Sequence, residues 1–416
     1  MSEIDNSVSG AQSTIEAPIK SIRLAPLERL MVRWFQGLER GQLTIEFPSG
    51  HSQTFGQGAV TPQGLLKIHD LRLVLRMLFA GDLGLAEGYL KGEWETSNLS
   101  ALLTVGAINL DDLSGALQSG WLSRLQGRLR HAMRANTKRG SRRNIAAHYD
   151  LGNAFYQPWL DSTMTYSSAL FVDFDESLFV AQRRKYARLA EELDIQPGDR
   201  VLEIGCGWGG FAEYAAAEYD CAVVGLTLST EQAAYARARM ENAGLSERVE
   251  IRLQDYRDVQ GFFEKIVSIE MFEAVGVEHW PIYFDTLRQR LKPGGRAVVQ
   301  TITIGDEHFA TYRSTPDFIQ HYIFPGGVLP SPSAFIGSAT TAGMAVCNRH
   351  FFGRSYAETL RRWKEDFLTA WPTIQELGFD ERFRRMWLYY LCYSEVGFDT
   401  GKIDVAQFTI EHRCPM

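Results

Sequence analysis

The first hundred residues show two different spacings of apolar side chains. Residues 25–38 place them at helical intervals, whereas residues 42–47 alternate between apolar and polar positions, which is typical of a strand with one buried face. A serine–glycine turn signal follows that strand. Residues 69–79 are largely apolar, and we expect them to begin as a strand and to continue as a helix. These elements predict a small mixed α+β domain over residues 21–120.

Beyond residue 149 the pattern changes to short apolar runs separated by helical segments. The strand-like runs are residues 200–204, 222–226, 265–269 and 295–301. Apolar runs of this length between helical patterns are typical of a doubly wound parallel α/β sheet, whose strands are buried on both faces. From Tyr356 onward we expect helices rich in aromatic residues. This pattern predicts an α/β domain over residues 145–416.

The composition is that of a folded globular protein. Of the 416 residues, 45% are hydrophobic and 22% are charged, which excludes a disordered chain, a coiled coil and a collagen-like fibre. The length favours two domains. Residues 1–20 are polar and acidic, which predicts a loose tail and not a secretory signal. Five widely spaced cysteines, with no cluster of cysteine and histidine, predict reduced thiols and no metal site. With no run of 18 apolar residues, we expect a cytoplasmic protein without a spanning helix.

One segment reverses the acidic balance of the chain. The formal net charge is −7, yet residues 121–149 carry eight basic side chains and no acidic one. Leu122, Leu125 and Leu129 share a helical face there, so residues 121–144 are typical of a basic amphipathic helix that lies on anionic phospholipid at the inner face of a membrane. A linker with solvated charges is an equally good interpretation, while the near absence of aromatic residues argues against nucleic acid. The basic residues are Arg124, Arg128, Arg130, Arg134, Lys138, Arg139, Arg142 and Arg143.

A glycine-rich loop directly follows the predicted strand at 200–204. The loop consists of Gly205, Cys206, Gly207, Trp208, Gly209 and Gly210. Its glycines let the backbone turn sharply and approach a ligand closely. The spacing also fits a dinucleotide-binding loop, which is a weak signal alone. Glu203, two residues before the loop, gives the pattern E-x-G-x-G, which favours S-adenosylmethionine. Its carboxylate can hold the methionine ammonium or order the loop.

The end of the second predicted strand separates these two cofactor classes. A nicotinamide enzyme normally has an acidic residue there for the ribose hydroxyls, and this chain has Thr227. Ser229 is placed to cap the next helix, with a ligand role as the alternative, and Gln232 lies in that helix's first turn. Residues 254–258 are placed to border an adenine. These features predict a methyltransferase.

A series of further motifs runs in order along the chain. They are HYDLGN at 148–153, TYSSA at 165–169, IGCGWGG at 204–210, GLTLSTEQ at 225–232, QDYRD at 254–258, MFEAVG at 271–276, YIFPGG at 322–327 and IDVAQF at 403–408. Together they resemble the cyclopropane-fatty-acyl-phospholipid synthase family, which includes the mycolic acid cyclopropane synthases. The resemblance is dense over residues 145–410, and GLAEGYLKGEWE at 84–95 is similar to the N-terminal domain of longer bacterial members. It implies a Rossmann-like methyltransferase sheet with helical lipid-binding insertions.

The resemblance implies transfer of a methyl group from S-adenosylmethionine to the cis double bond of an acyl chain on a phospholipid. It assigns the cofactor contacts to Tyr166, Ser167, Glu203, the 205–209 loop, Thr227, Leu228, Ser229, Gln232, Tyr256 and Arg257. Attack by the double bond leaves a carbocation, which aromatic faces can stabilise. The candidates are Tyr322, Phe324, Trp363 and Tyr390, and for each of them a place in the ordinary hydrophobic core is the alternative.

In the family, a bound bicarbonate takes the proton whose loss closes the cyclopropane ring, and a Glu, a His, a Tyr and a Cys hold that anion. By resemblance, Glu273 and Tyr356 match the Glu and the Tyr. Ser168 stands at the usual Cys, Gln300 at the usual His, and Ser394 at a further Cys near the C-terminus. Serine and glutamine can bind an anion but carry no positive charge.

These departures leave three functions to compare. Ring closure is the expected outcome because the overall match is close. Methylation without a ring, giving a methyl-branched or methylene fatty acid that can be a precursor of furan fatty acids, is the alternative that Ser168 and Gln300 favour. A non-catalytic lipid-binding homologue is the third, and the intact Glu273 and glycine loop weigh against it. Members of the family often form homodimers, which is an expectation here as well.

Overall fold

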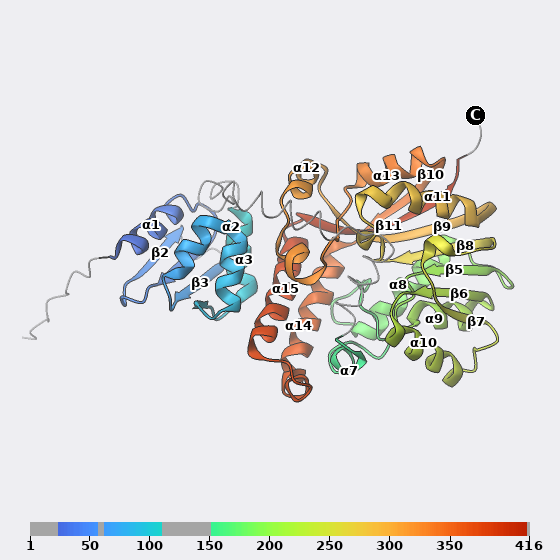
Figure 1. Cartoon of the computed structure of the whole chain (residues 1–416), viewed down its shortest axis with the longest axis horizontal. Helices are drawn as coiled ribbons and strands as arrows, with labels where there is room; N and C mark the ends of the chain where they lie inside the picture. Colours follow the sequence, from blue (N-terminus) through green and yellow to red (C-terminus); the bar gives the residue numbers. More distant parts are fainter. Residues whose placement is uncertain (1–23, 57–61, 110–150, 414–416) are drawn as a thin grey trace, which may run out of the picture.

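The computed structural model describes residues 24–56, 62–109 and 151–413. The predicted tail at 1–20 and all eight basic residues of the 121–149 segment lie outside these ranges. Within them the chain builds two sheets, with a pair of long helices between them (Figure 1). No helix of the described ranges is both long and apolar enough to cross a membrane.

The N-terminal part folds around a four-stranded sheet with the strand order β2-β1-β3-β4. Its elements are α1 (Pro26–Phe35), β1 (Gln42–Glu46), β2 (Ser52–Gly56), β3 (Gln63–Ile68), α2 (Arg72–Leu90), β4 (Trp94–Glu95) and α3 (Leu99–Ile108). The predicted helix and strand near the start are confirmed. The strand expected at the start of 69–79 is wrong: β3 ends at Ile68, and α2 takes up the apolar run because its residues pack against the sheet at helical intervals.

The larger sheet has seven strands in the order β10-β11-β9-β8-β5-β6-β7. The strands are β5 (Arg200–Ile204), β6 (Ala222–Thr227), β7 (Val249–Leu253), β8 (Phe263–Ile269), β9 (Leu291–Ile304), β10 (Met344–Phe351) and β11 (Ile403–His412). The strands from β5 to β9 pair in parallel, and β10 and β11 add an antiparallel edge. The prediction of an α/β fold built on a parallel sheet is confirmed, together with its four strands.

Three strands were not predicted, and each lies near or at an edge of the sheet. β7 is an edge strand that alternates between buried and exposed residues and carries charged side chains. β10, at the opposite edge, is exposed or half-buried at every residue after Met344. β11 falls in the segment from Tyr356 onward that was expected to be helical, and it corrects that expectation. Partial exposure dilutes the apolar runs of β7 and β10, whereas β11 is buried over residues 405–410 and its apolar run is interrupted by the polar Gln407 and Thr409.

Helices cover both faces of this sheet, because successive strand residues point to opposite sides. Val201, Val223 and Val267 pack against α8 (Leu178–Leu193), α9 (Gly210–Tyr219) and α10 (Thr230–Asn242). Leu202 and Ile266 pack against α11 (Trp280–Arg290) and α13 (Pro332–Thr341) on the other face. The doubly wound arrangement leaves the carboxyl ends of the parallel strands free, which is where ligands bind in such sheets.

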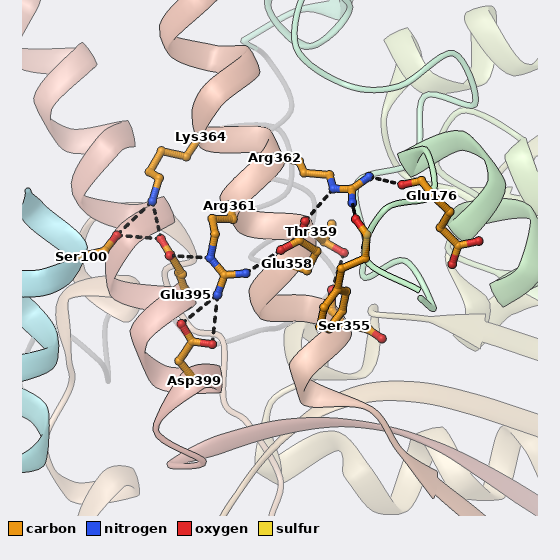
Figure 2. Close-up of polar contacts among 11 residues, drawn as sticks. Ser100, Glu176, Ser355, Glu358, Thr359, Arg361, Arg362, Lys364, Glu395 and Asp399 are labelled. Atoms are coloured by element: carbon orange, nitrogen blue, oxygen red, sulfur yellow. Dashed lines mark hydrogen bonds and ion pairs between the residues drawn. The ribbon is translucent and has the colours of Figure 1, made fainter. Parts of the chain in front are cut away.

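The helices α14 (Gly353–Glu376) and α15 (Glu381–Asp399) lie between the two sheets and join them (Figure 1). Glu395 on α15, of which 4% is exposed, accepts hydrogen bonds from Ser100 Oγ of α3 and from Lys364 Nζ of α14, both at 2.7 Å. Arg361 donates to the same carboxylate at 3.2 Å and to Asp399 (Figure 2). A buried carboxylate with three donors therefore ties the N-terminal sheet to the helical layer.

Candidate active site

A cavity of about 1540 Å³ opens at the carboxyl ends of the parallel strands. One end is formed by the glycine loop after β5 and the tips of β6 and β8. The other end reaches Leu43, Leu66 and Leu102 of the N-terminal part. Tyr356 of α14 and Tyr390 of α15 line the space between these ends. Polar groups at one end and apolar groups at the other suit two ligands of different chemistry.

Two hydrogen bonds hold the start of the glycine loop against β6. The N–H groups of Gly205 and Cys206 both donate to the carbonyl oxygen of Leu226, at 2.9 and 2.8 Å. Gly207 lines the cavity at a φ of +53°, and no atom lies within 4 Å of the position that a Cβ would take. A side chain there would fill space that a ligand can use. Gly209 faces α10 instead, where a Cβ would meet Ala236 at 3.1 Å. The predicted loop thus has a ligand side and a packing side.

Glu203 lines the cavity next to the glycine loop. It is 2% exposed, and its Oε2 has no hydrogen-bond partner among the described residues. Burial raises the pKa of this carboxyl well above its usual range, and the positive charge of Lys185 opposes that shift. An unpartnered carboxyl oxygen beside an open space fits a cationic ligand group.

The tip of β6 brings most of its predicted cofactor residues to the cavity. Thr227 Oγ1 donates to Gln232 Oε1 at 2.8 Å, and both residues line the cavity together with Leu228. Ser229 Oγ accepts the N–H of Gln232 at 3.3 Å as the cap of α10, so the capping interpretation is confirmed. Ser229 itself lies outside the cavity lining. Thr227 Oγ1 also accepts the N–H of Ser229 at 3.2 Å, so its remaining acceptor position and the amide nitrogen of Gln232 are the groups suited to ribose hydroxyls.

The segment after β7, which was predicted to border an adenine, lines the cavity. Asp255 holds the guanidinium of Arg257 through Nε at 2.8 Å and through its terminal nitrogen at 2.6 Å, and it caps the short 3-10 turn Tyr256–Asp258. Tyr256 lines the cavity and packs against Tyr283, with ring centroids 5.5 Å apart. Burial raises the pKa of Tyr256 to about 12. The fixed, uncharged ring presents a surface on which a base can stack.

A lysine that the sequence analysis missed supports this end of the site. Lys185 of α8 is fully buried, and its Nζ donates to Ser167 Oγ and to Gln182 Oε1, both at 2.7 Å. Gln182 in turn donates to the carbonyl oxygen of Ser167 at 2.9 Å. Burial lowers the pKa of Lys185 to about 7. The only signal in the sequence was a basic residue on the otherwise buried face of an amphipathic helix.

Three of the predicted catalytic residues converge on a fourth residue that the sequence analysis did not select. Glu270 follows β8 and accepts three hydrogen bonds: from Ser168 N at 2.9 Å, from Gln300 Nε2 at 2.8 Å and from the hydroxyl of Tyr356 at 2.6 Å. Ser168 contributes its backbone only, since its Oγ donates to the carbonyl oxygen of Ala169. The expectation that the Ser168 hydroxyl holds an anion is therefore corrected.

Glu273 lines the cavity one turn further on. Its Oε1 accepts the N–H of Ile302 at 2.5 Å, while its buried Oε2 has no partner among the described residues. Burial, and then the nearby charge of Glu270, raise the pKa of Glu273 to about 8. Ser394 of α15 also lines the cavity, whereas Cys392 is buried outside the lining.

Of the predicted aromatic residues, Phe324 and Tyr390 line the cavity, with ring centroids 6.3 Å apart. Tyr390 also accepts a hydrogen bond from the hydroxyl of Tyr166 at 2.8 Å, which connects the two ends of the site.

Trp363 is buried behind Tyr166, 5.2 Å from its ring, and is part of the core. The hydroxyl of Tyr322 donates to Glu87 at 3.1 Å, away from the lining. For Trp363 and Tyr322 the substrate role is therefore corrected, while Tyr389 and Tyr393 line the cavity without having been predicted.

Comparison with known proteins shows which family this chain resembles. The sequence profile described as mycolic acid cyclopropane synthetase matches residues 136–408. The chain belongs to this family. It is 43% identical to the tuberculostearic acid methyltransferase UfaA1 of Mycobacterium tuberculosis over 80% of either chain, and 40% identical to the cyclopropane-fatty-acyl-phospholipid synthase of Escherichia coli over 76% of this chain and 79% of that one. The structure of the mycolic acid cyclopropane synthase CmaA1 complexed with SAH and CTAB is similar at 33% identity, with a TM-score of 0.61, covering 65% of this chain and 97% of that one.

This cyclopropane synthase-like protein is thus an S-adenosylmethionine-dependent lipid methyltransferase with a Rossmann-like sheet. The residues present fit the cofactor: the open space beside Gly207 admits it, the unpartnered oxygen of Glu203 suits its ammonium, and Thr227 and Gln232 suit its ribose. When bound, S-adenosylmethionine supplies an electrophilic methyl group.

Proposed function

We propose that this enzyme methylates the cis double bond of an acyl chain esterified to a membrane phospholipid. The observation that carries the proposal is the single cavity that runs from the glycine loop to the apolar residues of the N-terminal part. Its volume of about 1540 Å³ exceeds the roughly 300–1,000 Å³ of a pocket for one small ligand. Space for a cofactor and an acyl chain together supports the proposal.

The residues of the middle section suit the chemistry of an alkene. Attack by the double bond leaves a positive charge on the acyl chain, and the faces of Phe324 and Tyr390 can each stabilise it by roughly 1 kcal/mol. The surrounding buried tyrosines exclude water, which would otherwise add to the cation. A proton must then leave the chain, and the carboxyl groups of Glu270 and Glu273 lie in the same section of the cavity.

The first candidate product is a cyclopropane ring, formed when the proton leaves the new methyl group. Glu273 and Tyr356, which match the family's Glu and Tyr by resemblance, both line the cavity. The 40% identity to a protein named as a cyclopropane-fatty-acyl-phospholipid synthase supports the same product.

A second product is a methyl-branched or methylene chain, formed when the proton leaves a neighbouring carbon. Gln300 in place of the family's His, and Glu270 in contact with it, favour this product because they change the group that accepts the proton. The 43% identity to a protein named as a methyltransferase supports it as well.

The test is an assay with the purified protein, S-adenosylmethionine and vesicles of phospholipid that carries cis-monounsaturated chains. We expect methylated acyl chains, detected by mass spectrometry after release of the fatty acids. A free cis-monounsaturated fatty acid in a parallel reaction tests the requirement for a phospholipid. High-field cyclopropyl signals in the proton NMR spectrum identify the ring, and vinyl methyl or exomethylene signals identify the second product. No methylated chain, together with no thermal shift from S-adenosylhomocysteine, supports the non-catalytic alternative and overturns the proposal.

We further propose that the basic 121–149 segment docks the enzyme on anionic phospholipid. Eight basic side chains without an acidic one give a local positive charge on a chain whose net charge is −7. Docking would hold the enzyme at the membrane that contains its proposed substrate.

A further inference from the structure

Glu270 occupies the centre of the group of donors that, by family resemblance, holds a soluble anion. Its Oε1 accepts hydrogen bonds from Ser168 N and Gln300 Nε2, and its Oε2 accepts one from Tyr356. These donors come from the loop before α8, from β9 and from α14, and they meet at one carboxylate. A carboxylate and a bicarbonate present the same pair of oxygens to such donors.

The backbone of Glu270 shows that this placement is specific. The residue has a φ of +50°, in the left-handed region that is unfavourable for a residue with a side chain. Its N–H donates to the carbonyl oxygen of Gln300 at 2.8 Å, which holds the strained conformation. Strain of this kind is concentrated at functional sites. At Glu270 this backbone conformation directs a carboxylate into the cavity, at a position where glycine would be free of strain.

We propose that Glu270 is the proton acceptor of this enzyme and replaces the soluble bicarbonate, so that turnover does not require bicarbonate. The proposal rests on the proposed methylation of an acyl double bond. A carboxylate has about four acceptor positions, and the three hydrogen bonds leave one of them, on Oε2, for the proton.

The electrons balance without another reactant. The π pair of the double bond forms the new bond to the methyl carbon, and the pair of the broken sulfur–carbon bond stays on sulfur. A C–H bond of the resulting cation then breaks, its proton goes to Oε2 of Glu270, and its electron pair closes either a ring or a new double bond. Glu270 is left neutral and returns the proton to water after the product leaves.

The test compares the wild type with Glu270→Gly in buffer freed of carbonate and in buffer with millimolar bicarbonate. Glycine adopts the left-handed backbone without strain, so the variant opens the anion position without disturbing the turn. We expect the wild-type rate to be equal in the two buffers. We expect Glu270→Gly to be at least ~100-fold slower without bicarbonate, as for loss of a general base, and at least tenfold faster when it is added.

A second readout needs neither cofactor nor turnover. Bicarbonate should raise the melting temperature of Glu270→Gly, because it satisfies the donors of Ser168, Gln300 and Tyr356, and it should leave the wild type unchanged. Asp194→Gly is the matched control, since Asp194 also has a positive φ of 54° but ends α8 at the surface. Its rate and its response to bicarbonate should equal those of the wild type. Glu270→Gln tests the loss of the charge with the side chain retained, and it should be slow in both buffers.

A wild-type rate that falls when carbonate is removed would overturn the proposal. So would a Glu270→Gly variant that turns over at the wild-type rate without bicarbonate, or one that neither binds bicarbonate nor is rescued by it. If the wild type methylates no acyl chain at all, the proposed function fails instead, and the melting measurement still reports whether Glu270 fills an anion site.

Discussion

Glu273 accepts a hydrogen bond from the backbone N–H of Ile302 at 2.5 Å, while its second carboxyl oxygen has no partner among the described residues. One oxygen thus ties the turn after β8 to β9, and the other remains available within the cavity wall. Glu270 lies three residues earlier and is held by three donors instead of one. Burial raises the pKa of both carboxyl groups, but at Glu270 the hydrogen bond from Tyr356 and the charge of Lys185 oppose the rise, whereas at Glu273 the charge of Glu270 adds to it.

The raised pKa of Glu273 predicts a dependence of stability on pH. The group titrates near 4.5 in the unfolded chain and at about 8 in the folded protein. Between these values the folded protein binds more protons, so its free energy of unfolding falls as the pH rises and levels off above about pH 8. The side chain of Glu273→Gln cannot ionise. The free energy of unfolding of this variant, relative to that of the wild type, should therefore rise by roughly 1–3 kcal/mol between pH 5 and pH 9. Urea unfolding at both pH values measures the two free energies of unfolding. Glu376→Gln, at an exposed position, is the control, and its free energy of unfolding should differ from that of the wild type by the same amount at both pH values. A constant difference for Glu273→Gln as well would contradict the prediction.

Gly207→Ala should weaken cofactor binding. The added Cβ enters the open space beside the loop, so we expect the affinity for S-adenosylhomocysteine to fall at least tenfold in calorimetry. Gly198→Ala is the matched control: Gly198 also has a positive φ, of +85°, and open space around it, but it lies outside the cavity lining. Both variants should lose a similar stability of about 1 kcal/mol. An equal loss of affinity in the two variants would show that backbone strain, and not the cavity, is responsible.

Restoring the family's anion-binding residues should change the product. The triple variant with Glu270→Gly, Gln300→His and Ser168→Cys recreates an open anion position with a histidine beside it. We expect its turnover to require bicarbonate and its products to contain a larger fraction of cyclopropane than those of the wild type, measured by proton NMR. An unchanged product ratio would mean that other parts of the cavity decide which proton leaves.

Neutralising Glu395 should loosen the junction of the two sheets. Glu395→Gln leaves Lys364 and Arg361 without their buried carboxylate, and we expect it to lower the free energy of unfolding by about 2 kcal/mol or more. Asp399→Asn is the control, because that carboxylate also contacts Arg361 but is 42% exposed, and its loss should cost less than about 1 kcal/mol. Urea unfolding compares the two. Equal effects would show that burial of Glu395 contributes nothing to the junction.

The basic segment should determine binding to anionic vesicles. Each basic side chain near such a surface contributes about 1 kcal/mol, so replacing four of them by glutamine should lower vesicle binding strongly, most of all at low salt. The four are Arg124, Arg128, Arg130 and Arg134. A control set with the same loss of charge takes basic residues from the domain of the large sheet: Arg183, Arg248, Arg288 and Lys292. Vesicle flotation should separate the two sets. An equal loss in both would attribute binding to net charge alone.

The sequence by itself determined the features that depend on neighbouring residues. The four central strands, the glycine loop, Thr227 at the strand tip and the cap at Ser229 all follow from short-range spacing, because a strand and the turn after it are encoded within a few residues. The resemblance to a lipid methyltransferase family rested on the same local motifs and was confirmed. The strand predicted at the start of 69–79 failed, while the helix predicted to follow it is α2, because an apolar run of that length suits a buried helix equally well.

Only the tertiary structure decided which side chains meet. Ser168, Gln300 and Tyr356 were predicted separately, yet their common partner is Glu270, a residue that carries no local signal apart from its acidity. Lys185 reaches Ser167, and Glu395 reaches Ser100 across 295 positions, for the same reason. Packing also placed Trp363 in the core and Tyr390 in the cavity, although both are aromatic residues on adjacent helices. Hydrogen bonds between distant segments depend on how the sheet and helices pack, and one sequence without its fold does not specify that packing.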